Sequence, residues 1–134
     1  MPSDDLFLTD DDYARVVALE PDPQLRKELD RAVVVPPSSI SSGIVTLYSR
    51  IRYLDEQTGA HAEVQLVHPG DANTELGKVS VLAPIGAALL GLALGQAIDW
   101  EFPDGQTRRL RVEEILYQPE TWPREAADGM PESF

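Results

Sequence analysis

The chain has 134 residues, 43% of them hydrophobic, which is the scale of one small domain with an appendage. Its 23 acidic and 11 basic side chains give a formal net charge of −12, so the molecule repels phosphate backbones and free nucleic acid is not an expected partner. Cysteine is absent from the sequence, which excludes a disulfide framework and a thiolate site.

Two short helices are predicted within residues 8–35. Thr9 and Asp12 match a capping box at the start of the first helix, and Asp22, followed by a proline, is placed to cap the second. The apolar residues at helical spacing are Tyr13, Val16, Val17, Leu25, Leu29, Ala32 and Val33, after which Pro36 ends the second helix. Because the connecting loop is short, we expect an antiparallel helical hairpin with Glu20 and Asp22 at its tip.

The globular body is expected to begin with an antiparallel pair of strands. Residues 44–53 and 62–68 alternate apolar and polar side chains as half-buried strands do, and residues 55–59 join them as a loop. The Pro-Gly-Asp-Ala-Asn-Thr sequence of residues 69–74 then predicts a surface loop.

The run from Val79 to Gly95 changes its hydrophobic period, which indicates a strand leading into a short buried helix. Pro84 suits the first helical position, because its missing N–H group would be unpaired there anyway. The apolar residues on one face of this helix are Ile85, Ala88, Leu89 and Leu92. Gly91 or Gly95 offers the left-handed residue that ends it.

Two further strands complete the predicted sheet. Residues 97–102 form the first, the sequence Pro103–Gly105 forms the turn, and the second runs to Tyr117. In this last strand Leu110 and Val112 stand at even-numbered positions, whereas Ile115 and Tyr117 stand at odd-numbered ones. An extra residue near Glu113 and Glu114, that is, a β-bulge, is predicted because it would keep both groups on one face of the sheet. This order of elements predicts an α+β protein in which one short helix packs on a face of an antiparallel sheet.

The chain therefore divides into three predicted parts. Residues 1–39 are the helical hairpin and a linker, residues 40–119 are the globular body, and residues 120–134 are a proline-containing tail that we expect to be mobile. No apolar run reaches the roughly 18 residues of a membrane-spanning helix, and the first 12 residues are acidic where a signal peptide is basic. We expect a cytoplasmic protein with no membrane partner.

Side chains suited to catalysis are few. His61 and His68 fall on opposite faces of one predicted strand, so they would not share a metal ion, and solvated structural roles are favoured. Packing and helix termination explain the glycines Gly86, Gly91 and Gly95 better than phosphate binding does. The sequence also contains no nucleophile elbow and no phosphate-binding loop. We expect no catalytic residue, no cofactor and no metal, and hence no enzyme.

Five arginines lie on the predicted strands: Arg50, Arg52, Arg108, Arg109 and Arg111. The favoured interpretation is cross-strand pairing with Glu63, Glu113 and Glu114. The alternative is a docking patch for an acidic protein surface.

Three segments carry a family resemblance: Val45–Arg50 (VTLYSR), Ala83–Leu92 (APIGAALLGL) and Leu116–Glu120 (LYQPE). The second resembles the Pro-(Ile/Leu)-Gly-x-Ala-Leu-Leu-Gly pattern in the C-terminal domain of the bacterial GreA/GreB transcription elongation factors. Together the three resemble the Rnk-like (regulator of nucleoside diphosphate kinase) members of that family. The resemblance covers about residues 8–120 and implies an FKBP-like fold.

In the Gre factors, a long coiled coil enters the secondary channel of RNA polymerase and presents acidic residues to the catalytic metal. The helices predicted here have about a dozen residues, or roughly 18 Å, so Glu20 and Asp22 could not reach that metal. The resemblance thus implies a noncatalytic regulator that binds RNA polymerase at the channel rim without stimulating transcript cleavage. It also implies competition with Gre-type factors and a link to nucleoside diphosphate kinase regulation.

The same resemblance places the polymerase-binding residues at Ala83, Pro84 and Ile85, with Asp71 and Asn73 in a neighbouring loop. Helix capping and core filling explain Pro84 and Ile85 equally well, so both interpretations stay open. An alternative function is that of an FKBP-like peptidyl-prolyl cis-trans isomerase. Its aromatic pocket would be drawn from Tyr48, Tyr53, Trp100, Phe102 and Tyr117.

Overall fold

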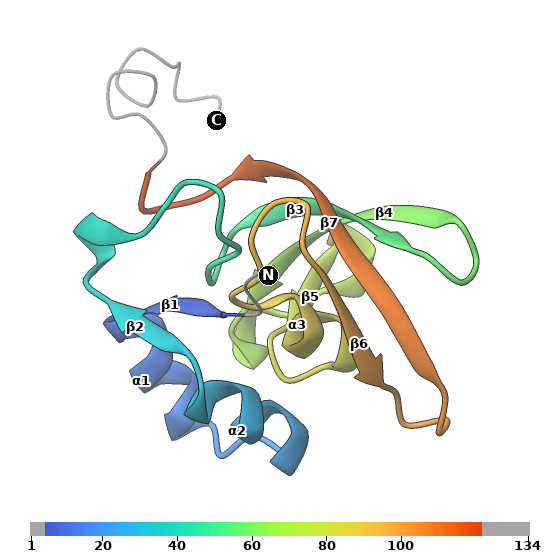
Figure 1. The fold of residues 1–134 in the computed structure, drawn as a ribbon, viewed down its shortest axis with the longest axis horizontal. Coiled ribbons are helices and arrows are strands. Elements are labelled where there is room, and N and C mark those ends of the chain that lie inside the picture. Colours follow the sequence, from blue (N-terminus) through green and yellow to red (C-terminus); the bar gives the residue numbers. More distant parts are fainter. Residues whose placement is uncertain (1–4, 122–134) are drawn as a thin grey trace.

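A computed structural model describes residues 5–121 of the chain (Figure 1). The helices are α1 (Asp10–Ala18), α2 (Pro23–Asp30) and α3 (Pro84–Leu89), the 3₁₀ turns are η1 (Pro37–Ser39), η2 (Pro69–Asp71) and η3 (Thr74–Leu76), and the strands are β1 (Phe7–Thr9), β2 (Val33–Val35), β3 (Arg50–Asp55), β4 (Ala60–Val67), β5 (Lys78–Ser80), β6 (Ala97–Glu101) and β7 (Thr107–Tyr117). The predicted α+β class is confirmed. Most of the predicted tail lies outside the described residues.

Local capping confirms the two N-terminal helices. Thr9 Oγ1 accepts a hydrogen bond from Asp12 N at 3.0 Å, and Asp22 Oδ1 accepts one from Leu25 N at 3.0 Å. The second helix ends at Asp30, so its predicted extension to Pro36 is wrong. Three consecutive valines form β2 instead, since β-branched side chains favour extended backbone and a following proline disfavours a helical residue before it.

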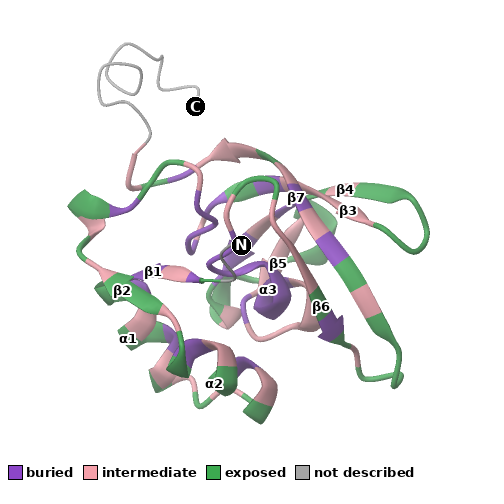
Figure 2. Cartoon of the chain, viewed as in Figure 1, coloured by how far each residue is buried: buried purple, intermediate pink, exposed green. Residues whose placement is uncertain are grey.

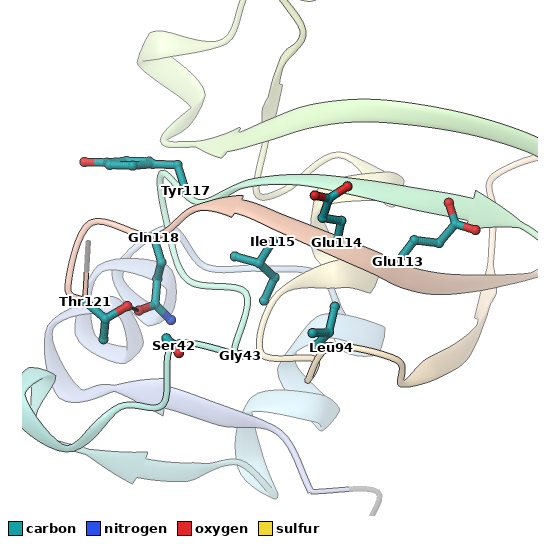
Figure 3. A pocket seen from close by; sticks show the side chains of 9 residues that line it. All are labelled: Ser42, Gly43, Leu94, Glu113, Glu114, Ile115, Tyr117, Gln118 and Thr121. Carbon is teal, nitrogen blue, oxygen red and sulfur yellow. Dashed lines mark hydrogen bonds between the residues drawn. The ribbon is translucent and has the colours of Figure 1, made fainter. Parts of the chain in front are cut away.

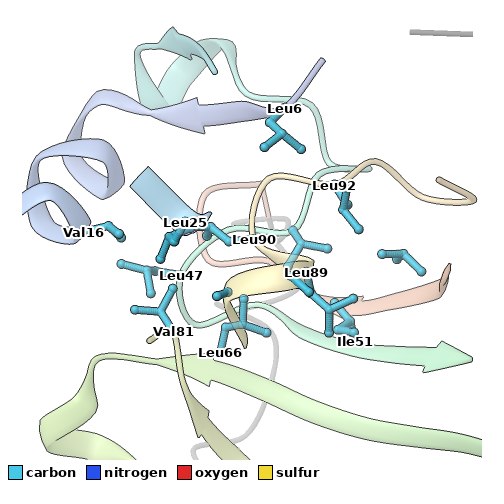
Figure 4. Packing of buried hydrophobic residues seen from close by; sticks show 14 of the residues in the cluster. Leu6, Val16, Leu25, Leu47, Ile51, Leu66, Val81, Leu89, Leu90 and Leu92 are labelled. Carbon is cyan, nitrogen blue, oxygen red and sulfur yellow. The ribbon is translucent and has the colours of Figure 1, made fainter. Parts of the chain in front are cut away.

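β1 and β2 pair in parallel and so bring together the two ends of the segment that contains the N-terminal helices. Phe7 N, in β1, donates a hydrogen bond to Gly91 O of the body at 3.1 Å. Val16 of α1 and Leu25 of α2 belong to the same buried cluster as Leu47 and Leu89 of the body (Figure 4). The helical hairpin is therefore packed on the rest of the chain rather than standing apart from it. The domain boundary near residue 39 stays a prediction.

The main sheet has the strand order β5-β4-β3-β7-β6. β3, β4, β6 and β7 pair as antiparallel neighbours, as predicted, but β5 pairs with β4 in parallel. The sheet is consequently mixed, because η2 and η3 carry the chain back to Gln65 before β5 begins, so β5 runs alongside the last three residues of β4 in the same direction. The FKBP-like description of this fold stays a prediction.

The strand predicted over residues 44–53 begins only at Arg50. The backbone turns before it, with Ser49 N donating to Thr46 O at 2.9 Å and Tyr48 in the left-handed region at φ 69°. The predicted bulge in β7 is confirmed: the register with β3 shifts at Glu113, and it shifts again at Leu116. These bulges bend β7 across the sheet (Figure 1).

α3 lies buried at the centre of the molecule, between the end of β5 and β6 (Figure 2). Pro84 occupies its first turn, as predicted, and both Gly91 and Gly95 are left-handed with φ 85°. Gly86 has a packing role, because a Cβ atom there would lie 2.2 Å from Ser80 O. No helix within residues 5–121 is both long and apolar enough to cross a membrane.

Candidate docking surface

The three residues predicted at the start of α3 are half-buried. Ala83 is the N-cap residue, and its carbonyl oxygen accepts a hydrogen bond from Ala87 N at 2.8 Å. Ile85 packs against the hydrophobic core while keeping part of its surface in solvent. The capping and core-filling interpretation thus holds for part of each side chain, and the exposed remainder is available to a partner.

A shallow cavity of ≈ 280 Å³ lies beside the start of α3. Pro84 and Leu82 line one side of it, and Trp100 and Phe102 line another. Asp22, from the predicted hairpin tip, lines it as well, so the fold brings this tip residue to the predicted docking segment. Glu20, the other tip residue, is exposed and lies outside the cavity lining.

The helical hairpin is fastened at this point by Gln24. Its side-chain Nε2 donates to Glu101 O at 3.0 Å, and its Oε1 accepts from Glu101 N at 3.0 Å. Glu101 belongs to the edge strand β6, so a side-chain amide pairs with backbone that would otherwise face solvent. Sequence reasoning missed this contact, since nothing in the local pattern links residues 77 positions apart.

Asp71 and Asn73, the other predicted docking residues, lie in the exposed loop that precedes β5. The Tyr48 hydroxyl donates to Asp71 Oδ2. Asn73 N donates to Lys78 O at 2.8 Å, and Lys78 N donates to Asn73 O at 3.0 Å. Asn73 Oδ1 also accepts from Glu75 N at 3.1 Å. These bonds hold the loop along β5, whose far end leads into the start of α3.

Tyr48 also belongs to this surface, although the sequence analysis did not predict a role for it there. A non-glycine residue in the left-handed region costs about 1 kcal/mol or more, so its conformation is imposed by the surrounding fold. The hydrogen bond to Asp71, followed by partial burial, raises the pKa of Tyr48 above its ordinary value. Its place in the VTLYSR segment is the one sequence signal that could have drawn attention to it.

A second polar cluster joins α1 to the segment before β3. Asp12 Oδ2 accepts a hydrogen bond from Leu47 N at 3.0 Å, and the side chain is almost fully buried. Burial raises the pKa of Asp12 to about 6, the Leu47 N–H lowers it, and the charge of Glu120 raises it. Glu120 Oε1 in turn accepts from Thr46 Oγ1 at 2.8 Å. Asp12 was expected only as part of a cap, and its longer-range role emerges from the fold.

Gln118, in the LYQPE segment, connects the end of β7 to the segment that precedes β3. Its Nε2 donates to Ile44 O at 2.7 Å and to Ser41 O at 2.8 Å. The side chain also lines a shallow cavity of ≈ 480 Å³, with Leu94 and Ile115 as its apolar part (Figure 3). The two hydrogen bonds from Gln118 to backbone carbonyl groups give the LYQPE segment a structural role.

Most of the strand arginines pair with carboxylates, but only Glu63 and Glu114 are predicted partners, because Glu113 contacts His61 instead. Arg52 contacts Glu63 and Glu114 at 3.3 and 3.7 Å. The other pairs are Arg108 with Asp55 and Asp104, Arg109 with Glu56 and Asp99, and Arg111 with Glu56. Among the described residues, Arg50 has no such partner.

The histidines lie in different settings, as their parity indicated. His61 Nδ1 is 2.6 Å from Glu113 Oε1, and His68 Nδ1 accepts a hydrogen bond from Gly70 N at 3.1 Å. Within residues 5–121, no three histidine, aspartate or glutamate side chains gather as metal ligands would.

The aromatic residues considered for an isomerase pocket separate into different places. Trp100 and Phe102 line the cavity beside α3, whereas Tyr48 and Tyr117 line another that also includes Asp12. Tyr53 lines neither of these two cavities. The geometry therefore does not assemble the five side chains around one substrate.

Comparison with known proteins gives consistent similarities. Residues 40–117 match the family model described as "Transcription elongation factor, GreA/GreB, C-term". The chain is 43% identical over 99 residues to the Regulator of nucleoside diphosphate kinase of Escherichia coli (strain K12), which covers 72% of this chain and 71% of that protein. It is 34% identical over 80 residues to Transcription elongation factor GreA of Thermodesulfovibrio yellowstonii, which covers 60% of this chain and 51% of that protein.

A solved structure shows the same similarity in three dimensions. The prokaryotic transcription elongation factor GreA/GreB from Nitrosomonas europaea superposes with a TM-score of 0.66 at 36% sequence identity. The superposition covers 86% of this chain and 100% of that chain.

Proposed function

The chain belongs to the family of GreA/GreB transcription elongation factors, and from that premise we propose that it is a noncatalytic transcription regulator that binds RNA polymerase. It docks at the rim of the secondary channel and does not stimulate transcript cleavage. Its resemblance to the regulator of nucleoside diphosphate kinase extends the proposal to an effect on that enzyme's level. RNA polymerase as partner also implies the cytoplasm as its location.

The attachment of the hairpin tip to β6 is the observation that carries this proposal. Cleavage by a Gre-type mechanism needs acidic residues that project far from the docked domain. Here α1 and α2 span nine and eight residues, or about 14 and 12 Å, and Gln24 holds their tip against Glu101. Asp22 caps α2 and lines a cavity beside the body, so its carboxylate is already engaged at short range.

The docking surface comprises the start of α3 and the loop before β5. Ala83, Pro84 and Ile85 contribute half-buried apolar surface, while Asp71 and Asn73 contribute an exposed polar margin. An apolar centre with a polar rim is the usual anatomy of a protein interface. The two parts are connected by β5, so a partner could contact both without a change in the fold.

A prolyl isomerase is not favoured by any observation here. The family relatives are named as regulators and elongation factors, and the aromatic side chains needed for a substrate pocket are dispersed. Function resides in a site rather than in a fold, so an FKBP-like sheet would not by itself supply isomerase activity.

Retention of RNA polymerase on the immobilised chain tests the proposal. At low salt we expect retention, and we expect an excess of a Gre factor to displace the polymerase because the two share a docking site. Failure to retain polymerase at low salt would overturn the proposed function. Retention that a Gre factor does not reduce would overturn the proposed position at the channel rim.

A further inference from the structure

Arg50 and Lys78 stand out because they are unpaired cations in a chain with about twice as many acidic as basic side chains. Among residues 5–121, neither side chain forms an ion pair or side-chain hydrogen bond. Arg50 is exposed and Lys78 is half-exposed. In such an acidic molecule a cation readily finds a carboxylate, as the neighbouring Arg52 does. Arg26 and Lys27 also lack ion pairs among the described residues, but they occupy successive positions of a helix, whereas Arg50 and Lys78 lie in one row across the sheet.

The register of the sheet places these two cations in one row. Arg50 of β3 lies opposite Gln65 of β4, and Gln65 lies opposite Lys78 of β5. Because adjacent strands are 4.7–4.9 Å apart, the backbones of Arg50 and Lys78 are about 10 Å apart. Their side chains share the face opposite to the buried Ile51, which is the solvent face of the sheet.

The next row of the same face shows what distinguishes Arg50. Arg52 lies opposite Glu63 on one side and Glu114 on the other, and it pairs with both. Arg50 instead lies between Gln65 and Tyr117, which are uncharged. Gln65 directs its side-chain amide to Tyr48 O at 3.0 Å. On this face, Arg52 is therefore paired with two carboxylates, whereas Arg50 has no carboxylate opposite it.

Four carboxylates around this row already have partners, whereas the exposed Glu75, in the turn before Lys78, forms no ion pair among the described residues. Glu63 and Glu114 bind Arg52, Asp71 accepts from the Tyr48 hydroxyl, and Glu120 accepts from Thr46. Their engagement leaves the positive charge of Arg50 and Lys78 open to solvent. Asn73 continues the row, since its backbone pairs with Lys78 on the side away from Gln65. The cationic row therefore begins at one of the residues proposed to dock polymerase.

We propose that Arg50 and Lys78 bind an acidic segment of RNA polymerase, with two carboxylates spaced to match the two cations. This inference rests on the proposed function and assigns a charged half to its docking surface. Two isolated cations match a pair of protein carboxylates, because the net charge of −12 repels the many charges of a continuous phosphate backbone more strongly than it repels a short acidic segment. An arginine that faces solvent can bind a carboxylate through two parallel hydrogen bonds.

The test compares two doubly substituted chains that lose the same charge. Arg50→Gln with Lys78→Gln removes the cationic row. Arg26→Gln with Lys27→Gln is the matched control, because these exposed cations of α2 also lack ion pairs among the described residues. Binding to purified RNA polymerase is measured by fluorescence anisotropy at about 0.01 M and about 0.15 M salt. Circular dichroism melting confirms that each variant is folded.

We expect the first variant to bind about fivefold more weakly at low salt, with a smaller difference at higher salt, and the control to stay within about twofold of the unchanged chain. Equal weakening of both variants, or no weakening of either, would overturn the inference while leaving the proposed function intact. Binding to labelled duplex DNA that depends on Arg50 and Lys78 would assign the row to nucleic acid and overturn it too. Absence of polymerase binding by the unchanged chain would overturn the proposed function, and the inference with it.

Discussion

The side-chain amide of Gln24 is hydrogen-bonded to the backbone of Glu101 through both its nitrogen and its oxygen, each at 3.0 Å. Glu101 is part of the edge strand β6, and the amide takes the place that a further strand would occupy. The contact joins the tip of the helical pair to the sheet, 77 residues away in the chain. It determines where the tip lies relative to the proposed docking surface.

Gln24→Ala should loosen this attachment without unfolding the protein. Loss of the two hydrogen bonds should lower the free energy of unfolding by about 1 kcal/mol, since the site is exposed and water replaces the amide. Hydrogen exchange at the Glu101 amide should accelerate. Gln106→Ala is the control, because the exposed Gln106 side chain makes no such contact among the described residues. Unchanged exchange at Glu101 would contradict the attachment.

Gly86→Ala should be strongly destabilising. The new Cβ would lie 2.2 Å from Ser80 O and 3.1 Å from Val81 Cα, both backbone atoms that cannot move aside cheaply. We expect a loss of about 3 kcal/mol or more in unfolding free energy, measured by urea denaturation. Gly43→Ala is the control, because its Cβ would meet other atoms only at 3.7 Å or more. Equal stability of the two variants would show that α3 is not packed as described.

Asp12 should make stability depend on pH. Burial raises its folded-state pKa from 3.8 to about 6, so the folded state holds the proton more tightly than the unfolded state. The resulting stabilisation is complete below about pH 4 and is lost as pH rises through about 6, with a full amplitude of about 3 kcal/mol. Asp12→Asn keeps an acceptor for Leu47 N and removes the titration.

The measurement is the difference in unfolding free energy between the unchanged chain and Asp12→Asn from pH 4 to pH 7. That difference should shift in favour of the variant as pH rises. Asp11→Asn, at the exposed neighbouring position in the first turn of α1, should show no such trend. Parallel stability curves for the unchanged chain and Asp12→Asn would rule out the raised pKa.

Transcript cleavage should be absent. In a backtracked elongation complex, we expect cleavage at the intrinsic rate, because Glu20 and Asp22 lie at the end of short helices that are attached to the body. A Gre factor serves as the positive control, and an excess of this protein should reduce its effect. Asp22→Asn is the informative variant, since it retains a capping oxygen for Leu25 N. Dinucleotide release that depends on Glu20 or Asp22 would contradict the expectation.

Ile85→Asp tests the apolar part of the docking surface. Ile85 is half-buried, so the change should lower the melting temperature by a few degrees, corresponding to about 1 to 2 kcal/mol, and leave the domain folded. Polymerase binding should weaken about tenfold, because a charge replaces an apolar contact. A collapsed melting temperature would mean that Ile85 is core, and normal binding would mean that it does not dock.

Local sequence patterns predicted the elements whose signals lie within a few residues. The caps at Thr9 and Asp22, the turn before Gly105 and the helical start at Pro84 all formed where short-range chemistry placed them. The β-bulge at Glu113 was predictable as well, because the alternation of apolar residues in this strand shifts from even-numbered to odd-numbered positions there. The VVV sequence of β2 was misread because its first valine also fitted a helical period.

The tertiary structure determined which residues far apart in the sequence contact each other. The parallel pairing of β1 with β2, the bond from Leu47 N to Asp12 and the contact of Gln24 with Glu101 join positions 26, 35 and 77 residues apart. No periodicity along a chain encodes such partners, since each depends on how several buried faces pack at once. The unpaired row of Arg50 and Lys78 has the same origin. The sequence determined that the strands would carry arginines, but only the register of three strands decided which cation would be left without a carboxylate.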